Sequence, residues 1–145
     1  MLLFVQPILI AQVNTNDKLN GIWVSEKKDL KVKVYSINNI VYAKLVWFPC
    51  NHTIKKPMSE HKDALNSNKL LRNRSWLDIV ILNGLVYDGK DKWVNGSIYD
   101  PHTGKTWSAS VTLRSNNILE VRGYWGIELF GKTIIFNREL INTKK

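Results

Sequence analysis

The stretch that decides the fold is WVNGSIYDPHTGKTWSASVTLR, residues 93–114, in which two runs of alternating side chains flank a turn. In the second run, apolar residues occupy every other position from Trp107 to Leu113, and small hydroxyl residues fill the positions between them. Strict alternation with a period of two is typical of a β-strand with one buried face. We therefore expect strands over 93–99 and 105–114, joined as a hairpin.

The sequence between the two runs, DPHTG at 100–104, has the composition of a tight hairpin loop. Asp100 can accept hydrogen bonds from N–H groups of the turn, Pro101 fixes its own φ, and Gly104 supplies a positive φ. His102 is then expected in solvent at the loop tip. A tyrosine, an aspartate, a histidine and a lysine fall within seven positions here, but no nucleophile or oxyanion site accompanies them. We predict no catalytic residue and no enzyme activity.

Further alternating runs follow the same rhythm along the chain. They lie at 21–26, 31–37, 41–48, 77–82, 117–124 and 132–138. Turn residues such as Asn83-Gly84 separate them. About eight strands joined mostly by tight turns favour a closed antiparallel barrel over a sandwich, because a barrel leaves no exposed edge.

One stretch, residues 51–75, breaks the strand rhythm because it is polar and basic. We expect a long irregular segment with a short helix over 60–66, for which Ser59 is the N-cap. Cys50 just before it is the only cysteine, so no intrachain disulfide is possible, and a small buried residue is expected there. We predict no metal site and no cofactor, since no cysteine–histidine cluster or nucleotide-binding motif occurs.

The first twelve residues, MLLFVQPILIAQ, are uncharged, mostly apolar and too few to span a bilayer. They are similar to the apolar region and end of a secretory signal peptide, although no basic residue precedes them. We therefore expect a signal-peptide-like segment over 1–12, with a start upstream of Met1 as one explanation for the missing basic residues. A single domain over 13–145 and a periplasmic or secreted location follow. A buried first strand is the alternative for this segment.

Five stretches resemble one bacterial family: NGIW at 20–23, DALNSNKLLRNR at 63–74, WVNGSIYDPHTGKTW at 93–107, LEVRGYWGIELFGKT at 119–133 and NR at 137–138. They are similar to the domain of unknown function 2147 family (DUF2147), from about Gly21 to Arg138. The resemblance implies a small exported protein with an all-β, eight-stranded antiparallel up-and-down barrel of the lipocalin-like (calycin) type. It also implies that Gly21 and Trp23 meet Arg138 to close the barrel, with the guanidinium stacked on the indole.

Aromatic and arginine side chains are the candidates for ligand binding. The aromatics could fill the barrel or surround one small ligand, and both alternatives stay open. The arginines could hold a carboxylate or phosphate at the barrel mouth, bond loop carbonyls, or lie on a solvated face. The candidate ligand-binding residues are Trp47, Tyr99, Trp107, Arg122, Tyr124, Arg72 and Arg74.

Two functional hypotheses result from a net charge of +9 on a barrel rich in tryptophan. In the first, the exported barrel binds a small hydrophobic or amphipathic, lipid-like molecule in its interior. In the second, the barrel is packed solid and the basic loop around Lys62 and Lys69 binds an anionic polymer or membrane surface. We expect no nucleic acid partner, because the aromatics alternate onto buried faces and do not interleave with the basic residues.

Overall fold

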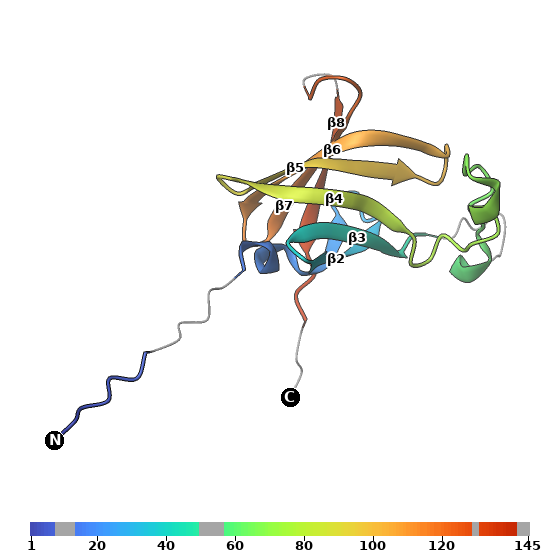
Figure 1. The fold of residues 1–145 in the computed structure, drawn as a ribbon. Coiled ribbons are helices and arrows are strands. Elements are labelled where there is room, and N and C mark those ends of the chain that lie inside the picture. The colour runs from blue at the N-terminus through green and yellow to red at the C-terminus, as the bar shows by residue number, and fades with distance from the viewer. Residues whose placement is uncertain (8–13, 50–56, 129–130, 142–145) are drawn as a thin grey trace.

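The computed structural model describes residues 1–7, 14–49, 57–128 and 131–141. These residues form one closed antiparallel barrel in which every strand pairs with its neighbours in the chain (Figure 1). The strands are β1 (Gly21–Ser25), β2 (Lys31–Ile37), β3 (Ile40–Trp47), β4 (Val80–Gly89), β5 (Lys92–Asp100), β6 (Lys105–Ser115), β7 (Ile118–Tyr124) and β8 (Gly131–Arg138). The expected all-β, eight-stranded up-and-down barrel is confirmed.

Closure of the barrel depends on the short first strand, which pairs along both of its edges. β1 pairs with β2 on one side and with β8 on the other, where Trp23 lies opposite Arg138 and Ser25 lies opposite Phe136. Because the last strand returns to the first, the inward faces of the strands share one interior.

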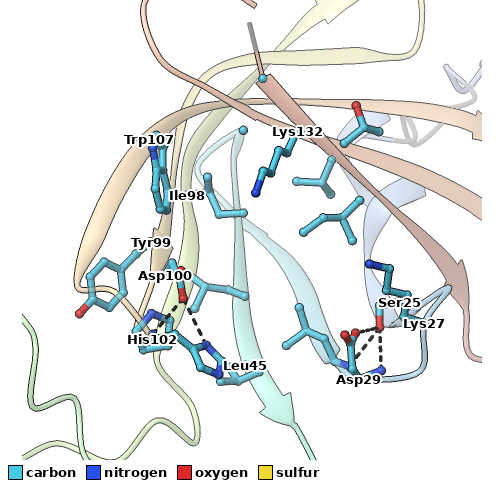
Figure 2. A pocket seen from close by; sticks show the side chains of 18 of the residues that line it. Ser25, Lys27, Asp29, Leu45, Ile98, Tyr99, Asp100, His102, Trp107 and Lys132 are labelled. Atoms are coloured by element: carbon cyan, nitrogen blue, oxygen red, sulfur yellow. Dashed lines mark hydrogen bonds and ion pairs between the residues drawn. The ribbon is translucent and has the colours of Figure 1, made fainter.

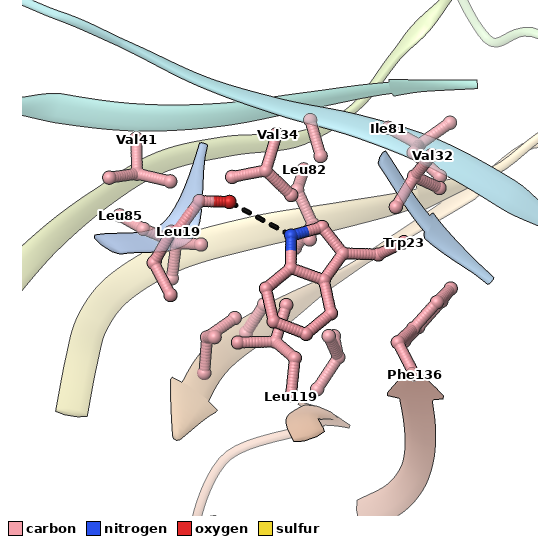
Figure 3. Packing of buried hydrophobic residues seen from close by; sticks show 14 of the residues in the cluster. Leu19, Trp23, Val32, Val34, Val41, Ile81, Leu82, Leu85, Leu119 and Phe136 are labelled. Carbon is pink, nitrogen blue, oxygen red and sulfur yellow. Dashed lines mark hydrogen bonds between the residues drawn. The ribbon is translucent and has the colours of Figure 1, made fainter. Parts of the chain in front are cut away.

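Alternating inward positions fill one part of that interior with apolar side chains. On β3, Ala43 and Leu45 are buried, and on β7 Leu119 and Val121 are buried, each pair separated by a residue that faces outward. Trp23 lies within this cluster, surrounded by aliphatic side chains (Figure 3). The period-two pattern of the sequence therefore becomes the barrel core.

The fourth strand differs from the expected one, and the predicted end at 82 is wrong. β4 begins at Val80 and runs through Asn83 and Gly84, which the sequence predicts as a turn. Asn83 pairs with Ser97 of β5, so the ladder continues past this dipeptide. The register against β3 shifts here and Gly84 has a φ of +77°. These residues therefore form a bulge that bends the strand and does not end it.

The segment between β3 and β4 has no helix over 60–66, and that prediction is wrong. Its described part is irregular, with two short 3-10 turns, η2 (Met58–Glu60) and η3 (Lys69–Leu71). Cys50 and the residues up to 56 lie outside the described residues, so the expectation for Cys50 stays a prediction.

Pairing within this segment explains why the helix does not form. Lys62 makes an isolated antiparallel bridge with Ser75, and the Asp63 N–H donates to the carbonyl oxygen of Arg74 (3.0 Å). Backbone groups used in this pairing cannot also make the bonds of a helix. We call residues 57–79 the docked segment, because side chains described below hold it against the barrel.

A 3-10 turn that the sequence analysis did not predict, η1 (Thr15–Leu19), precedes β1. Leu19 is fully buried, and the buried Asn16 accepts a hydrogen bond from Nε1 of Trp93 (2.8 Å). Residues 1–7 are exposed, form no helix or strand, and extend away from the barrel (Figure 1). No helix in the described ranges is both long and apolar enough to span a membrane.

Candidate functional site

A cavity of about 950 Å³ lies at one end of the barrel interior and is open to solvent. It is located where β1, β3, β5 and β7 end and where β6 and β8 begin. Its apolar wall contains Leu45, Ile81, Ile98, Val121 and Ile134, and Figure 2 shows Leu45 and Ile98 beside the open space. A concave site with such walls favours an apolar occupant.

Aromatic rings form the side of the mouth next to the docked segment. The Trp76 ring packs against Phe48, with centroids 5.3 Å apart, and against His102 of the β5–β6 turn, with centroids 4.6 Å apart. Phe48 meets His61 edge to face at 5.1 Å. Phe48, Trp76 and His102 all line the cavity. The same rings therefore attach the docked segment and form part of the cavity wall.

A buried carboxylate also holds the docked segment in place. Asp63 is fully buried and accepts hydrogen bonds from Arg74 Nε (2.9 Å), Asn66 Nδ2 (2.8 Å) and the Tyr99 hydroxyl. These donors make the buried charge tolerable. Burial and the hydrogen bond to Asp63 raise the pKa of Tyr99 to about 12. Tyr99 lines the cavity, but its hydroxyl points away from the open space (Figure 2).

The two candidate arginines of this segment, Arg72 and Arg74, are not among the residues that line the cavity. Arg72 Nε donates to the carbonyl oxygen of Asn66 (2.8 Å). Arg74 pairs with Asp63, and its guanidinium carbon lies 5.9 Å from the centroid of the Tyr99 ring. Their described contacts stabilise the docked segment.

Arg122 and Trp47 also lie outside the cavity lining. Arg122 Nε donates to the carbonyl oxygen of Glu128 (2.6 Å), and Nη1 donates to Thr133 Oγ1 (2.7 Å). The Lys31 ammonium lies 5.9 Å from the centroid of the Trp47 ring. The candidates that do line the cavity are Tyr99, Trp107 and Tyr124.

The β5–β6 turn contributes another part of the mouth. Asp100 Oδ1 accepts a hydrogen bond from the His102 N–H (2.9 Å), and Gly104, with a φ of +70°, donates its N–H to the Asp100 carbonyl oxygen (2.8 Å). Pro101 is buried and lines the cavity. A Cβ at Gly104 would lie 2.0 Å from the carbonyl oxygen of Leu65. The glycine therefore permits both the turn and the close approach of the docked segment.

The opposite end of the barrel is sealed by a stack of polar and aromatic groups. The Arg138 guanidinium carbon lies 4.2 Å from the centroid of the Trp23 ring, and Nη1 donates to the Asn20 carbonyl oxygen (2.8 Å). Trp23 Nε1 donates to the Leu19 carbonyl oxygen (2.8 Å). A Cβ at Gly21 would lie 3.2 Å from Arg138 Nη1, so the glycine makes room for the arginine. The structure thus brings together the three residues expected to close the barrel.

The sequence analysis missed the charged side chains at the mouth. Lys27 and Lys132 line the cavity, and both point into it (Figure 2). Asp29 is also at the mouth, where Oδ1 accepts a hydrogen bond from the Ser25 hydroxyl (2.7 Å). The alternation over 132–138 contains a signal for Lys132, because it continues the inward face of β8. Lys27 lies in a turn, where the sequence has no periodic pattern to orient it.

A closed eight-stranded antiparallel barrel, sealed at one end and open to an apolar cavity at the other, is a lipocalin-like barrel. A solved structure described as protein HP1028 from the human pathogen Helicobacter pylori, which belongs to the lipocalin family, is similar to this one. The TM-score is 0.72 at 29% sequence identity, over 85% of this chain and 84% of that chain.

The chain belongs to the DUF2147 family, described as uncharacterized protein conserved in bacteria, whose model matches residues 21–138. Comparison with curated proteins gave no match. The family expected from the sequence is therefore confirmed.

Proposed function

We propose that this protein binds one small hydrophobic or amphipathic molecule inside the barrel and acts without catalysis. The observation that supports this proposal is the open cavity of about 950 Å³ with aliphatic and aromatic walls. Ligand sites commonly have volumes of roughly 300–1,000 Å³ and mostly apolar linings. A cavity of this size also favours the binding hypothesis over a solid barrel that acts only through its basic surface.

Burial of an alkyl chain is sufficient to drive such binding. Each methylene transferred from water to an apolar site contributes about 0.8 kcal/mol, so the roughly sixteen methylenes of a long alkyl chain contribute about 13 kcal/mol before an association cost of roughly 5 kcal/mol. That cost removes part of the gain, and micromolar affinity corresponds to about 8 kcal/mol net. Micromolar binding of a long-chain amphiphile is therefore the expectation.

Titration with an environment-sensitive fatty-acid probe tests the proposal. The probe should bind saturably, be displaced by an unlabelled amphiphile, and quench tryptophan fluorescence, since Trp76 and Trp107 line the cavity. Ile134→Trp should fill part of the cavity and weaken binding. Ile37→Trp is the matched control, because Ile37 is exposed at the end of β2 and does not line the cavity. Absence of displaceable binding at micromolar protein, or equal binding by both variants, would refute the proposal.

We also propose that the protein is exported to the periplasm or secreted. The uncharged apolar character of residues 1–12 supports this, because it is similar to the core of a signal peptide. Expression of the full chain with a C-terminal tag, followed by fractionation and N-terminal sequencing, tests it. Cleavage near residue 12 and recovery outside the cytoplasm are expected. An intact cytoplasmic chain would count against export.

A further inference from the structure

We propose that the cavity selects amphiphiles with an anionic head group, and that Lys27 and Lys132 hold this group at the mouth. This inference rests on the proposed function and adds a ligand class to it. The shared chemistry is a carboxylate or phosphate on an apolar chain, with the chain in the barrel and the anion at the opening. The inference depends on the placement of the two lysines, the space around them and their lack of carboxylate partners.

Lys132 is an inward-facing residue at the open end of β8. Phe136 is buried in the core, and Ile134, two residues earlier, lines the cavity, so the period of two places Lys132 on the same face. Its cross-strand neighbour on β7 is Gly123, which has no side chain. The glycine leaves room on the cavity side for the lysine chain, whose ammonium points into the open space in Figure 2.

Lys27 approaches the mouth from the turn between β1 and β2, next to β8. The N–H of Glu26 donates to the carbonyl oxygen of Ile135 (2.8 Å), which extends the pairing of β1 with β8 up to the residue before Lys27. Figure 2 shows the Lys27 side chain directed into the cavity. One ammonium group from β8 and one from the turn after β1 therefore face the same cavity.

Neither lysine is neutralised by the protein within the described residues. The ion pairs there involve other lysines, arginines and His102, and none includes Lys27 or Lys132. The mouth also contains acidic residues, but two of them already accept hydrogen bonds. Asp29 binds the Ser25 hydroxyl (2.7 Å) and Asp100 binds N–H and hydroxyl groups of its own turn.

The remaining acidic residue of the lining, Glu26, directly follows β1, and it is exposed whereas Ser25 before it is buried. The charged groups directed into the open space in Figure 2 are therefore the two ammonium groups, whereas Asp29 and Asp100 are turned toward their own hydrogen-bond donors. An ion pair at a partly exposed mouth is worth up to about 1 kcal/mol, which is roughly a fivefold change in affinity.

The test compares head groups on a constant alkyl chain, by displacement of the neutral dye Nile red from the full-length protein. Four competitors are used: a fatty acid, a lysophosphatidate, the fatty alcohol and the alkylamine. The acid or the lysophosphatidate should bind about fivefold more tightly than the alcohol, and the amine should bind least. The stronger of the two anions identifies the source of the head group.

Variants assign the selectivity to the two lysines. Lys27→Met and Lys132→Met should each weaken binding of the anion about fivefold and leave the alcohol unchanged. Lys33→Met is the control, because Lys33 is exposed on the outer face of β2 and should change neither. Higher ionic strength should weaken binding of the anion but not of the alcohol in the unmodified protein, which keeps the test valid if a variant does not fold.

Equal affinities for acid, lysophosphatidate and alcohol, or tightest binding of the amine, would overturn the head-group proposal and leave the apolar cavity intact. A loss that is the same for anion and alcohol in the lysine variants would overturn it as well. If no competitor displaces the dye, the proposed function fails together with this inference.

Discussion

Replacement of Trp23 by alanine should open the sealed end of the barrel and destabilise the whole domain. Trp23 has no exposed surface, its indole N–H donates to the Leu19 carbonyl oxygen (2.8 Å), and the Arg138 guanidinium lies on its ring at 4.2 Å. The substitution removes a large part of the core at the point where β1 joins β8. It also leaves the Leu19 carbonyl oxygen without its indole donor and removes the ring on which the Arg138 guanidinium stacks.

The magnitude follows from these contacts. Truncation of a buried tryptophan to alanine costs about 3–5 kcal/mol. The unsatisfied carbonyl adds about 1 kcal/mol and the lost cation–π contact about 0.5 kcal/mol, although such terms do not add fully. A total near 4 kcal/mol is a large share of the 5–15 kcal/mol that typically stabilises a domain. At about 4 °C per kcal/mol for this size, the melting temperature should fall by about 15 °C.

Thermal melting followed by circular dichroism measures this loss directly. Trp125→Ala is the matched control, because Trp125 is 82% exposed at the open end, and its melting temperature should stay within about 2 °C of the unmodified protein. Trp23→Phe should lie between the two, since it keeps an aromatic ring but loses the N–H donor. If Trp23→Ala and Trp125→Ala melt at the same temperature, the role of Trp23 in closing the barrel is wrong.

Two further predictions concern the docked segment. Because burial and Asp63 raise the pKa of Tyr99 to about 12, the unfolded chain loses the phenol proton first, so stability should fall between about pH 10 and pH 12. Denaturant unfolding across this range should show the decline, and Tyr99→Phe should remove its phenol component. Gly104→Ala should destabilise more than Gly126→Ala, because both glycines have φ near +70° but only the first would place a Cβ against Leu65. Similar chemical-denaturation midpoints for the two alanine variants would contradict this explanation.

Strand positions could be predicted because every second residue of a strand faces the barrel core, which gives the sequence a period of two. In β6, the alternation from Trp107 to Leu113 matches the face that is buried at Ala109 and Val111. The local sequence gave the wrong prediction at Asn83-Gly84, because an Asn-Gly dipeptide is compatible both with a turn and with a β-bulge. Pairing with β5, which is remote in the sequence, decides between the two.

The candidate site was less predictable because it depends on contacts between distant segments. Asp63, remote from β5 in the sequence, accepts hydrogen bonds from the Tyr99 hydroxyl and from Arg74 Nε, and these bonds turn both polar groups toward Asp63. A run of basic residues gives no indication of that buried acceptor. Local propensity suggested a helix over 60–66, but tertiary pairing of Asp63 prevailed.

Within the part of the chain that the structure describes, contacts among Leu19, Trp23 and Arg138 close one end of the barrel, and the cavity opens to solvent at the other end. A ligand bound as proposed would therefore leave through the opening by which it entered. One ligand would have to dissociate before the next could enter, so the rate of ligand exchange would not depend on the concentration of competitor. A membrane or another protein that covers the cavity opening would therefore control both association and dissociation of the ligand.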